Sequence, residues 1–166
     1  MLGLGRRALQ VATSLKDRRE TIGVSESSCG GLISACLLAV PGASSYFIGA
    51  AVTYTRTSHK AFLGVPDEEL TSIRSATQEY ALLNARAVRD ALGTTWGFAE
   101  TGASGPTGNR YGDAAGHTCI AVSGPVERSI TLETGNSDRE ENMWAFVDAA
   151  FGLLEECLLE AEQPSS

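Results

Sequence analysis

The stretch TIGVSESSCGGLIS, residues 21–34, decides the expected fold, because a β-branched apolar run ends there in serines, a cysteine and two glycines. Residues 21–25 are typical of a short buried strand, and residues 30–40 of a helix that Pro41-Gly42 ends. Small nucleophiles at such a turn favour a catalytic site, since the start of a helix stabilises an oxyanion or a phosphate. The alternative is that Ser27 or Ser28 only caps the helix. Glu26 is either an orienting carboxylate or a charge at the start of the helix that favours the helix dipole.

Composition limits the classes of protein to which this chain can belong. It has 166 residues, of which 43% are hydrophobic and 20% charged, as is typical of one soluble globular domain. We expect a single domain over residues 1–162 and a frayed tail over residues 163–166. The formal net charge of −7 argues against a nucleic-acid partner. A small phosphorylated metabolite remains compatible, because one or two arginines and a few backbone amides can hold it locally.

The cysteine pattern indicates neither zinc nor a disulfide framework. The four cysteines are sparse and form no CxxC pair: they are Cys29, Cys36, Cys119 and Cys157. We therefore expect no metal and a reducing, cytoplasmic setting that keeps Cys29 a free thiol. No stretch approaches the roughly 20 consecutive apolar residues of a membrane span, so no membrane association is expected.

Strands and helices alternate along the remaining sequence. The spacing predicts helices over residues 4–19 and 57–63, a third that Thr77 caps and Gly93 ends, and a fourth from Ser137 or Asp138 to about Glu160. Strands are expected over residues 47–54 and 96–100, and a hairpin over residues 117–123 and 127–134. This alternation predicts an α/β fold, a three-layer α/β/α sandwich with a mixed, mostly parallel sheet.

Two further polar segments could contribute to a site. VTYTRTSHK, residues 52–60, offers His59 and Lys60 as bases for a serine, but neighbours on a helix do not share a face, so only one can point into a cleft. The segment could equally be a surface turn. TGASGPTGNR, residues 101–110, follows a strand and permits close approach to the backbone, yet it matches neither Walker A nor GxGxxG. His117 beyond it is either a second acid or base, or structural.

Taken together, these segments resemble the C-terminal domain of the competence/damage-inducible CinA proteins, whose stand-alone members act as nicotinamide-nucleotide amidases. The family pattern E-S-C-T-G-G-L corresponds to ESSCGGL at residues 26–32, and the family's V-T-Y to residues 52–54. Further matches are PGASS at residues 41–45, LGV at 63–65, TGASGP at 101–106 and SDR at 137–139. The resemblance extends over about residues 5–160.

The resemblance implies an α/β amidohydrolase that converts the carboxamide of nicotinamide mononucleotide to the acid and ammonia, without cofactor or metal. It implies Ser27 as the nucleophile and Tyr54 as a partner, with His59 or Lys60 as the base. The implied oxyanion donors are the amides of Cys29, Gly30 and Gly31. The implied substrate-binding residues are Glu26, Thr101, Gly102, Ser104, Gly105 and Arg139. Family members are commonly homodimers.

The chain departs from the family at polar positions. The family's lysine aligns with His59, and Lys60 lies one place beyond it; the family's threonine is Cys29 here, and an arginine is replaced by Met143. Two hypotheses follow. The domain is an amidohydrolase, in one variant with Cys29 as nucleophile, or it is a catalytically silent relative that binds a nucleotide or a partner protein in the same cleft.

Overall fold

A five-stranded sheet with the strand order β2-β1-β3-β4-β5 forms the centre of the molecule. The computed structural model describes residues 2–162, so the predicted tail at 163–166 lies outside the described residues. The strands are β1 (Ile22–Glu26), β2 (Phe47–Val52), β3 (Trp96–Ala103), β4 (His117–Ser123) and β5 (Arg128–Glu133). β1 is parallel to β2 and β3, whereas β4 is antiparallel to β3 and β5. The predicted mixed sheet with one hairpin is therefore confirmed.

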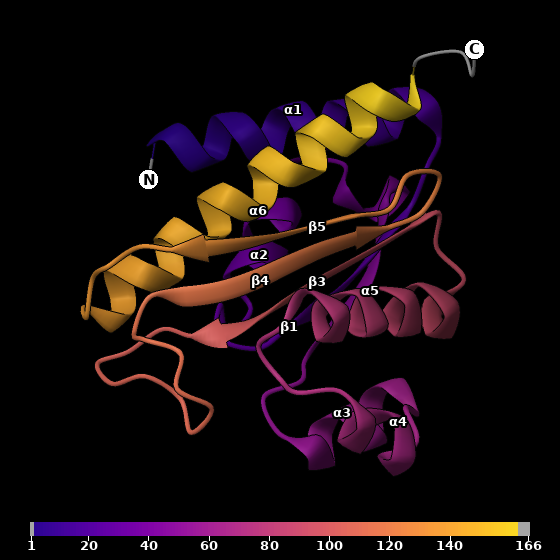
Figure 1. Ribbon diagram of the computed structural model, residues 1–166. Coiled ribbons are helices and arrows are strands. Elements are labelled where there is room, and N and C mark those ends of the chain that lie inside the picture. Colours follow the sequence, from indigo (N-terminus) through magenta and orange to yellow (C-terminus); the bar gives the residue numbers. More distant parts are fainter. Residues whose placement is uncertain (1, 163–166) are drawn as a thin grey trace.

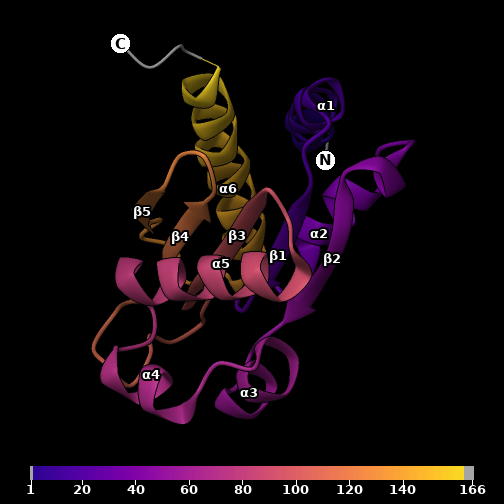
Figure 2. The ribbon, with the colours of Figure 1, turned by 90° about the vertical axis from the view of Figure 1, so that its right-hand side faces the viewer.

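Helices cover both faces of this sheet, which confirms the three-layer arrangement (Figures 1 and 2). One face carries α1 (Leu2–Arg18), α2 (Leu32–Leu38) and α6 (Arg139–Ala161), and the other carries α5 (Gln78–Leu92). The short helices α3 (Arg56–Leu63) and α4 (Asp67–Ser72) lie beyond α5, with α3 next to the end of β2 and α4 beside α3 (Figure 2). Helix α4 and the single 3-10 turn at Ala43–Ser45 were not predicted from the sequence.

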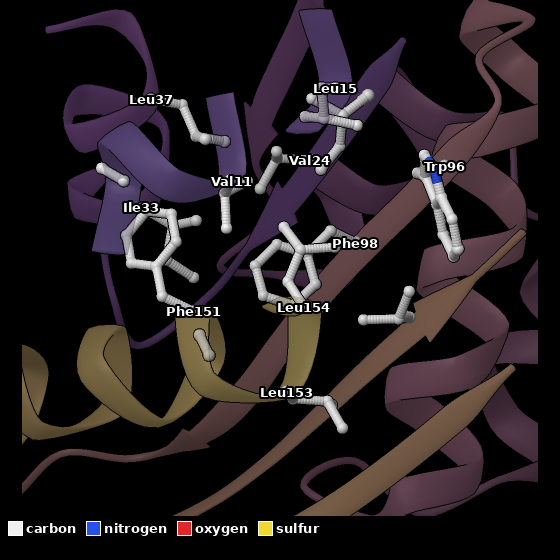
Figure 3. Close-up of a cluster of buried hydrophobic side chains, with 14 of the residues drawn as sticks. Val11, Leu15, Val24, Ile33, Leu37, Trp96, Phe98, Phe151, Leu153 and Leu154 are labelled. Atoms are coloured by element: carbon white, nitrogen blue, oxygen red, sulfur yellow. The ribbon is translucent and has the colours of Figure 1, made fainter. Parts of the chain in front are cut away.

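The main core lies between the sheet and the layer of α1, α2 and α6. Figure 3 shows Val24 and Phe98 from the sheet meeting Val11 and Leu15 of α1, with Leu154 of α6 beside them. These side chains are at most 1% exposed. Burial of this continuous apolar cluster fixes the register of the strands, because a slip of one residue would turn every buried side chain to the other face.

The layer beneath α5 is thinner and is built from small residues. Ala81 and Ala85 of α5 pack on Ala99 and Ala121 of the sheet. A Cβ atom added to Gly97 would lie 1.9 Å from the carbonyl oxygen of Ala85, so only glycine permits this close approach. The small side chains thus bring α5 close to β3.

Several predicted helix ends are confirmed, and one is not. The Thr77 side chain accepts a hydrogen bond from the Tyr80 amide, and Asp138, rather than Ser137, caps α6 through the Glu141 amide. Helix α2, however, begins at Leu32 and not at Gly30, because Gly30 and Gly31 have φ angles of 64° and 100° that interrupt helical geometry. Among the described helices, none is both long and apolar enough to cross a membrane.

Candidate active site

The candidate site lies at the carboxyl ends of β1, β2 and β3, where the parallel strands of an open α/β sheet deliver their following loops to one edge. Ser27 follows β1, Tyr54 follows β2, and Thr101 and Gly102 lie near the end of β3. They line one cavity of about 560 Å³. The other lining residues are Thr53, Thr55, Arg56, His59, Ser75, Ala76, Tyr80, Asn109, Arg110 and Tyr111.

Ser27 is half-buried at the wall of this cavity. Its backbone amide donates to Glu100, whereas its hydroxyl makes no hydrogen bond within residues 2–162. A hydroxyl without an internal partner at a cavity wall is free to meet a ligand. The fold therefore presents Ser27, and not Ser28, to the cavity as a potential nucleophile.

His59 is brought to the same cavity, although no hydrogen bond joins it to Ser27 in the described structure. Its Nδ1 atom lies 2.9 Å from the Thr55 carbonyl oxygen, which can only accept, so Nδ1 holds the ring proton and Nε2 is the unprotonated acceptor. Nε2 lies 3.4 Å from the Tyr80 hydroxyl. Burial lowers the pKa of His59 below its usual value, so the imidazole is neutral near pH 7.

Lys60 lies away from the cavity. Its ammonium nitrogen lies 2.9 Å from a carboxylate oxygen of Asp67, and both side chains are exposed. This follows from the helical register of α3, which buries His59 and turns the next residue outward. Of the two predicted bases, the structure thus brings only His59 to Ser27's cavity.

Tyr54 lies between this cavity and a second, adjoining one of about 260 Å³. Its hydroxyl is 3.5 Å from the Arg139 guanidinium, which also donates to the Gly105 carbonyl at 2.6 Å. The second cavity is lined by Ser28, Gly102, Ala103, Ser104, Gly105, Thr107, Gly108, Asn109 and Arg139 together with Tyr54. The predicted substrate-binding loop and Arg139 therefore lie next to Ser27.

Glu26 lies away from both cavities, which contradicts the substrate-binding role that the resemblance implies and agrees with the alternative of a charge at the start of a helix. It is 1% exposed, and its carboxylate accepts from the amides of Gly31, Ile33 and Ser34 and from the Ser34 hydroxyl. It thereby caps α2 from within the protein, so that neither Ser27 nor Ser28 serves as the cap. Burial raises the pKa of Glu26, while its hydrogen bonds with Ser34 and Ile33 act in the opposite direction.

The amides expected to hold an oxyanion also have partners inside the protein. The Cys29 amide donates to Glu100 at 2.8 Å, that of Gly31 to Glu26 at 3.0 Å, and that of Gly30 to the Ser27 carbonyl at 3.2 Å. The Cys29 side chain is fully buried. Burial, with the charge of Glu100, raises the pKa of its thiol well above the usual value, which makes Cys29 a poor nucleophile.

Two cavity arginines were missed from the sequence because each reads as an ordinary surface residue. Arg56 and Arg110 line the large cavity, and neither forms an ion pair with another described residue. Arg110 lies 2.8 Å from the Tyr111 hydroxyl and 5.0 Å from the centre of the Tyr111 ring. Two arginines without acidic partners, in a chain of net charge −7, make this cavity locally suited to an anion.

His117 lines neither cavity and has a structural position. Its side chain is buried between Glu133, which its Nδ1 contacts, and the Ala76 carbonyl oxygen, 2.8 Å from Nε2. Burial by itself lowers the pKa of His117, but the hydrogen bonds to Glu133 and Ala76 and the charge of Asp113 outweigh it and raise the pKa above its usual value.

Within residues 2–162, no group of three or more potential ligand side chains is arranged to hold a metal.

Comparison with sequence models of protein families matches residues 6–158 to the CinA C-terminal domain. The chain belongs to the CinA C-terminal domain family. A CinA-like protein from Myxococcus xanthus is 42% identical over 118 residues, which cover 71% of this chain and 28% of that protein. A CinA-like protein from Salinibacter ruber is 33% identical over 152 residues, which cover 90% of this chain and 37% of that protein. The chain therefore spans only a minor part of the length of these relatives.

Solved structures of CinA superfamily proteins share the fold. The competence/damage inducible protein CihA from Agrobacterium tumefaciens superposes with a TM-score of 0.85 at 25% identity, covering 96% of both chains. A CinA superfamily protein from Klebsiella pneumoniae gives a TM-score of 0.88 at 22% identity, covering 95% of this chain and 98% of its own. The α/β architecture of the CinA domain is thus shown in full, whereas these names specify no reaction.

Proposed function

We propose that this CinA domain is an amidohydrolase that cleaves the carboxamide of nicotinamide mononucleotide, or of a related small amide, to the acid and ammonia. The observation that supports this most is the position of Ser27, whose hydroxyl has no partner within the described residues and borders a cavity that also holds His59 and two arginines. The resemblance of residues 26–32 and 52–54 to the stand-alone amidases of the family supports the same reaction.

The proposed reaction proceeds through an ester on Ser27. The Ser27 oxygen attacks the carboxamide carbon while Nε2 of His59 takes the hydroxyl proton. The C–N bond then breaks, and His59 returns the proton to the nitrogen, so that ammonia leaves. A water molecule, deprotonated by the same imidazole, hydrolyses the ester, which releases the acid and restores the Ser27 hydroxyl.

The assignment of the base favours His59 over Lys60 because only His59 lines the cavity. The lone pair on Nε2 is available because Nδ1 donates to the Thr55 carbonyl. Access to Ser27 requires Nε2 to exchange its contact with Tyr80 for one with the serine. Tyr54, next to Arg139, borders the bound substrate between the two cavities.

Measurement of ammonia release from nicotinamide mononucleotide tests the proposal. We expect turnover of the nucleotide, and slower turnover, by about tenfold or more, of the nucleoside that lacks the phosphate, because Arg56 and Arg110 would lose their anionic partner. In the same assay, His59→Ala should remove most of the activity and Lys60→Ala should leave it unchanged. Absence of ammonia with both compounds would contradict the proposal.

A second candidate function is binding of a nucleotide without turnover. The occupied amides of Cys29 and Gly31 favour it, because two of the amides expected to hold an oxyanion already donate to carboxylates inside the protein. Isothermal titration calorimetry with the mononucleotide separates the two functions. Heat of binding with no ammonia release would support the silent relative, and turnover would eliminate it.

A further inference from the structure

Glu100 is a buried carboxylate at the centre of the turn that holds Ser27. It lies on β3, is 2% exposed, and lines neither cavity. One oxygen, Oε2, accepts from the Ser27 amide at 3.1 Å and from the Cys29 amide at 2.8 Å. The other, Oε1, accepts from the hydroxyl of Ser28 and, at 3.0 Å, from that of Thr118. None of these four partners is a basic side chain.

The Ser27 side chain depends on its backbone for its position. Its hydroxyl has no hydrogen bond within residues 2–162, so no hydrogen bond of the side chain itself fixes where it lies relative to the cavity. The backbone of residues 27–29 is in turn fixed by Glu100, which binds the amide on either side of Ser28. Glu100 thus occupies a place where the amides of Ser27 and Cys29 would otherwise be free to bind an external anion.

We propose that Glu100 is a positioning residue for Ser27: it fixes the backbone of residues 27–29 and thereby directs the Ser27 hydroxyl into the cavity. The catalytic part of this inference rests on the proposed function, whereas the structural part does not. Since an error of about 1 Å in the position of a nucleophile can cost about a hundredfold in rate, loss of this anchor should mainly lower kcat.

The two oxygens of Glu100 face different kinds of donor, and this predicts which substitution is tolerated. Oε2 faces two N–H groups, which can only donate, but Oε1 faces two hydroxyls, which can also accept. A glutamine at this position can therefore place its oxygen toward the amides and its NH2 group toward Ser28 and Thr118. Glu100 therefore acts mainly by placing two hydrogen-bond acceptors correctly, and its negative charge contributes less.

The first experiment is independent of catalysis. Amide NMR spectra of wild type, Glu100→Ala and Glu100→Gln report on the amides of Ser27 and Cys29, with the exposed Glu156→Ala as control. We expect Glu100→Gln to keep both amides protected from hydrogen exchange, and Glu100→Ala to expose them. Addition of formate, a free carboxylate, should restore protection in Glu100→Ala and change nothing in wild type or Glu156→Ala. If Glu100→Ala does not fold, retained protection in Glu100→Gln supports the proposal and lost protection overturns it.

The second experiment measures ammonia release by the same variants. We expect Glu100→Ala to lower kcat by about tenfold or more with KM within about twofold, Glu100→Gln to remain within about threefold of wild type, and formate to restore part of the kcat of Glu100→Ala. A wild-type kcat in Glu100→Ala would overturn the positioning role, and so would protected Ser27 and Cys29 amides in that variant. If wild type itself releases no ammonia, the proposed function fails, and the NMR result alone decides the structural part.

Discussion

The Nε2 atom of His117 lies 2.8 Å from the carbonyl oxygen of Ala76, a residue that lines the large cavity with a φ of 57°. Because the Nδ1 atom of the same ring contacts the Glu133 carboxylate, both ring nitrogens face an acceptor. His117 satisfies both only as an imidazolium. It thereby connects β4 and β5 to the segment at residues 73–77 that forms part of the cavity wall.

The two histidines are expected to differ in protonation at neutral pH. Nitrogen-15 NMR near pH 7 should show His117 protonated on both nitrogens and His59 protonated on Nδ1 alone, since the pKa of His117 is raised and that of His59 is lowered. Each histidine is the control for the other. A neutral His117 at pH 6.5 would contradict the account of this contact.

The raised pKa of His117 also predicts the pH dependence of stability. A group with a raised pKa in the native state contributes its full stability below its unfolded value, about 6.5, and loses it as the pH rises through the native value. Chemical denaturation should therefore show that His117→Gln costs about 1–3 kcal/mol at pH 6 and less at pH 9. A cost that grows with pH would have the wrong sign.

Glu26→Gln should destabilise the protein strongly, in contrast to Glu100→Gln. Both oxygens of Glu26 face backbone N–H groups, so the NH2 group of a glutamine must face a donor in either orientation. We expect a loss of about 2–4 kcal/mol in the free energy of unfolding, measured by urea denaturation. The exposed Glu156→Gln is the matched control and should be neutral; equal stability of the two variants would contradict the buried cap.

Gly97→Ala and Gly5→Ala should change stability in opposite directions. At Gly97 the added methyl group would meet the Ala85 carbonyl, whereas at Gly5, in α1, there is nothing within 4 Å. We expect Gly97→Ala to lower the melting temperature, with a loss of about 2 kcal/mol or more, and Gly5→Ala to raise it slightly through helix propensity. A neutral Gly97→Ala would show that α5 does not lie as close to β3 as described.

Arg110→Ala should weaken binding of the nucleotide. Arg110 lines the cavity without an acidic partner among the described residues, and a charge-assisted contact with phosphate is lost when it is removed. Calorimetry should show an increase in Kd of about tenfold, with Arg6→Ala, an exposed arginine of α1, as the matched control. If the affinity of Arg110→Ala equals that of wild type, the phosphate binds at another part of the cavity and not at Arg110.

The sequence was sufficient to predict the layers of the fold and the turn that holds Ser27. Strand and helix periodicity is local, and so are the caps of Thr77 and Asp138, which the structure confirms. The role of Glu100 was not predictable in this way. Glu100 reads as one charged residue in a strand, and it acquires its role only because folding brings it to amides that are more than 70 residues away in the chain.

The same limit applies to the polar residues of the site. His59 and Lys60 are neighbours of similar chemistry, and only the register of α3 separates the cavity residue from the surface one. Arg56 and Arg110 come from segments far apart in the sequence, and neither is distinguishable there from an exposed surface arginine. The resemblance implies a substrate-binding role for Glu26, yet all of its described hydrogen bonds come from the turn and helix that follow it, which agrees with its alternative role as a charge at the start of a helix.

The most direct test of the proposed chemistry is the rate of ammonia release from nicotinamide mononucleotide by wild type and by Ser27→Ala. Ser14→Ala, a substitution in α1 at a residue that lines neither cavity, serves as the control for removal of a hydroxyl. If Ser27 is the nucleophile, Ser27→Ala should lose at least about a thousandfold in kcat while Ser14→Ala equals wild type. Equal rates in wild type and Ser27→Ala, or no ammonia from either, would contradict the account.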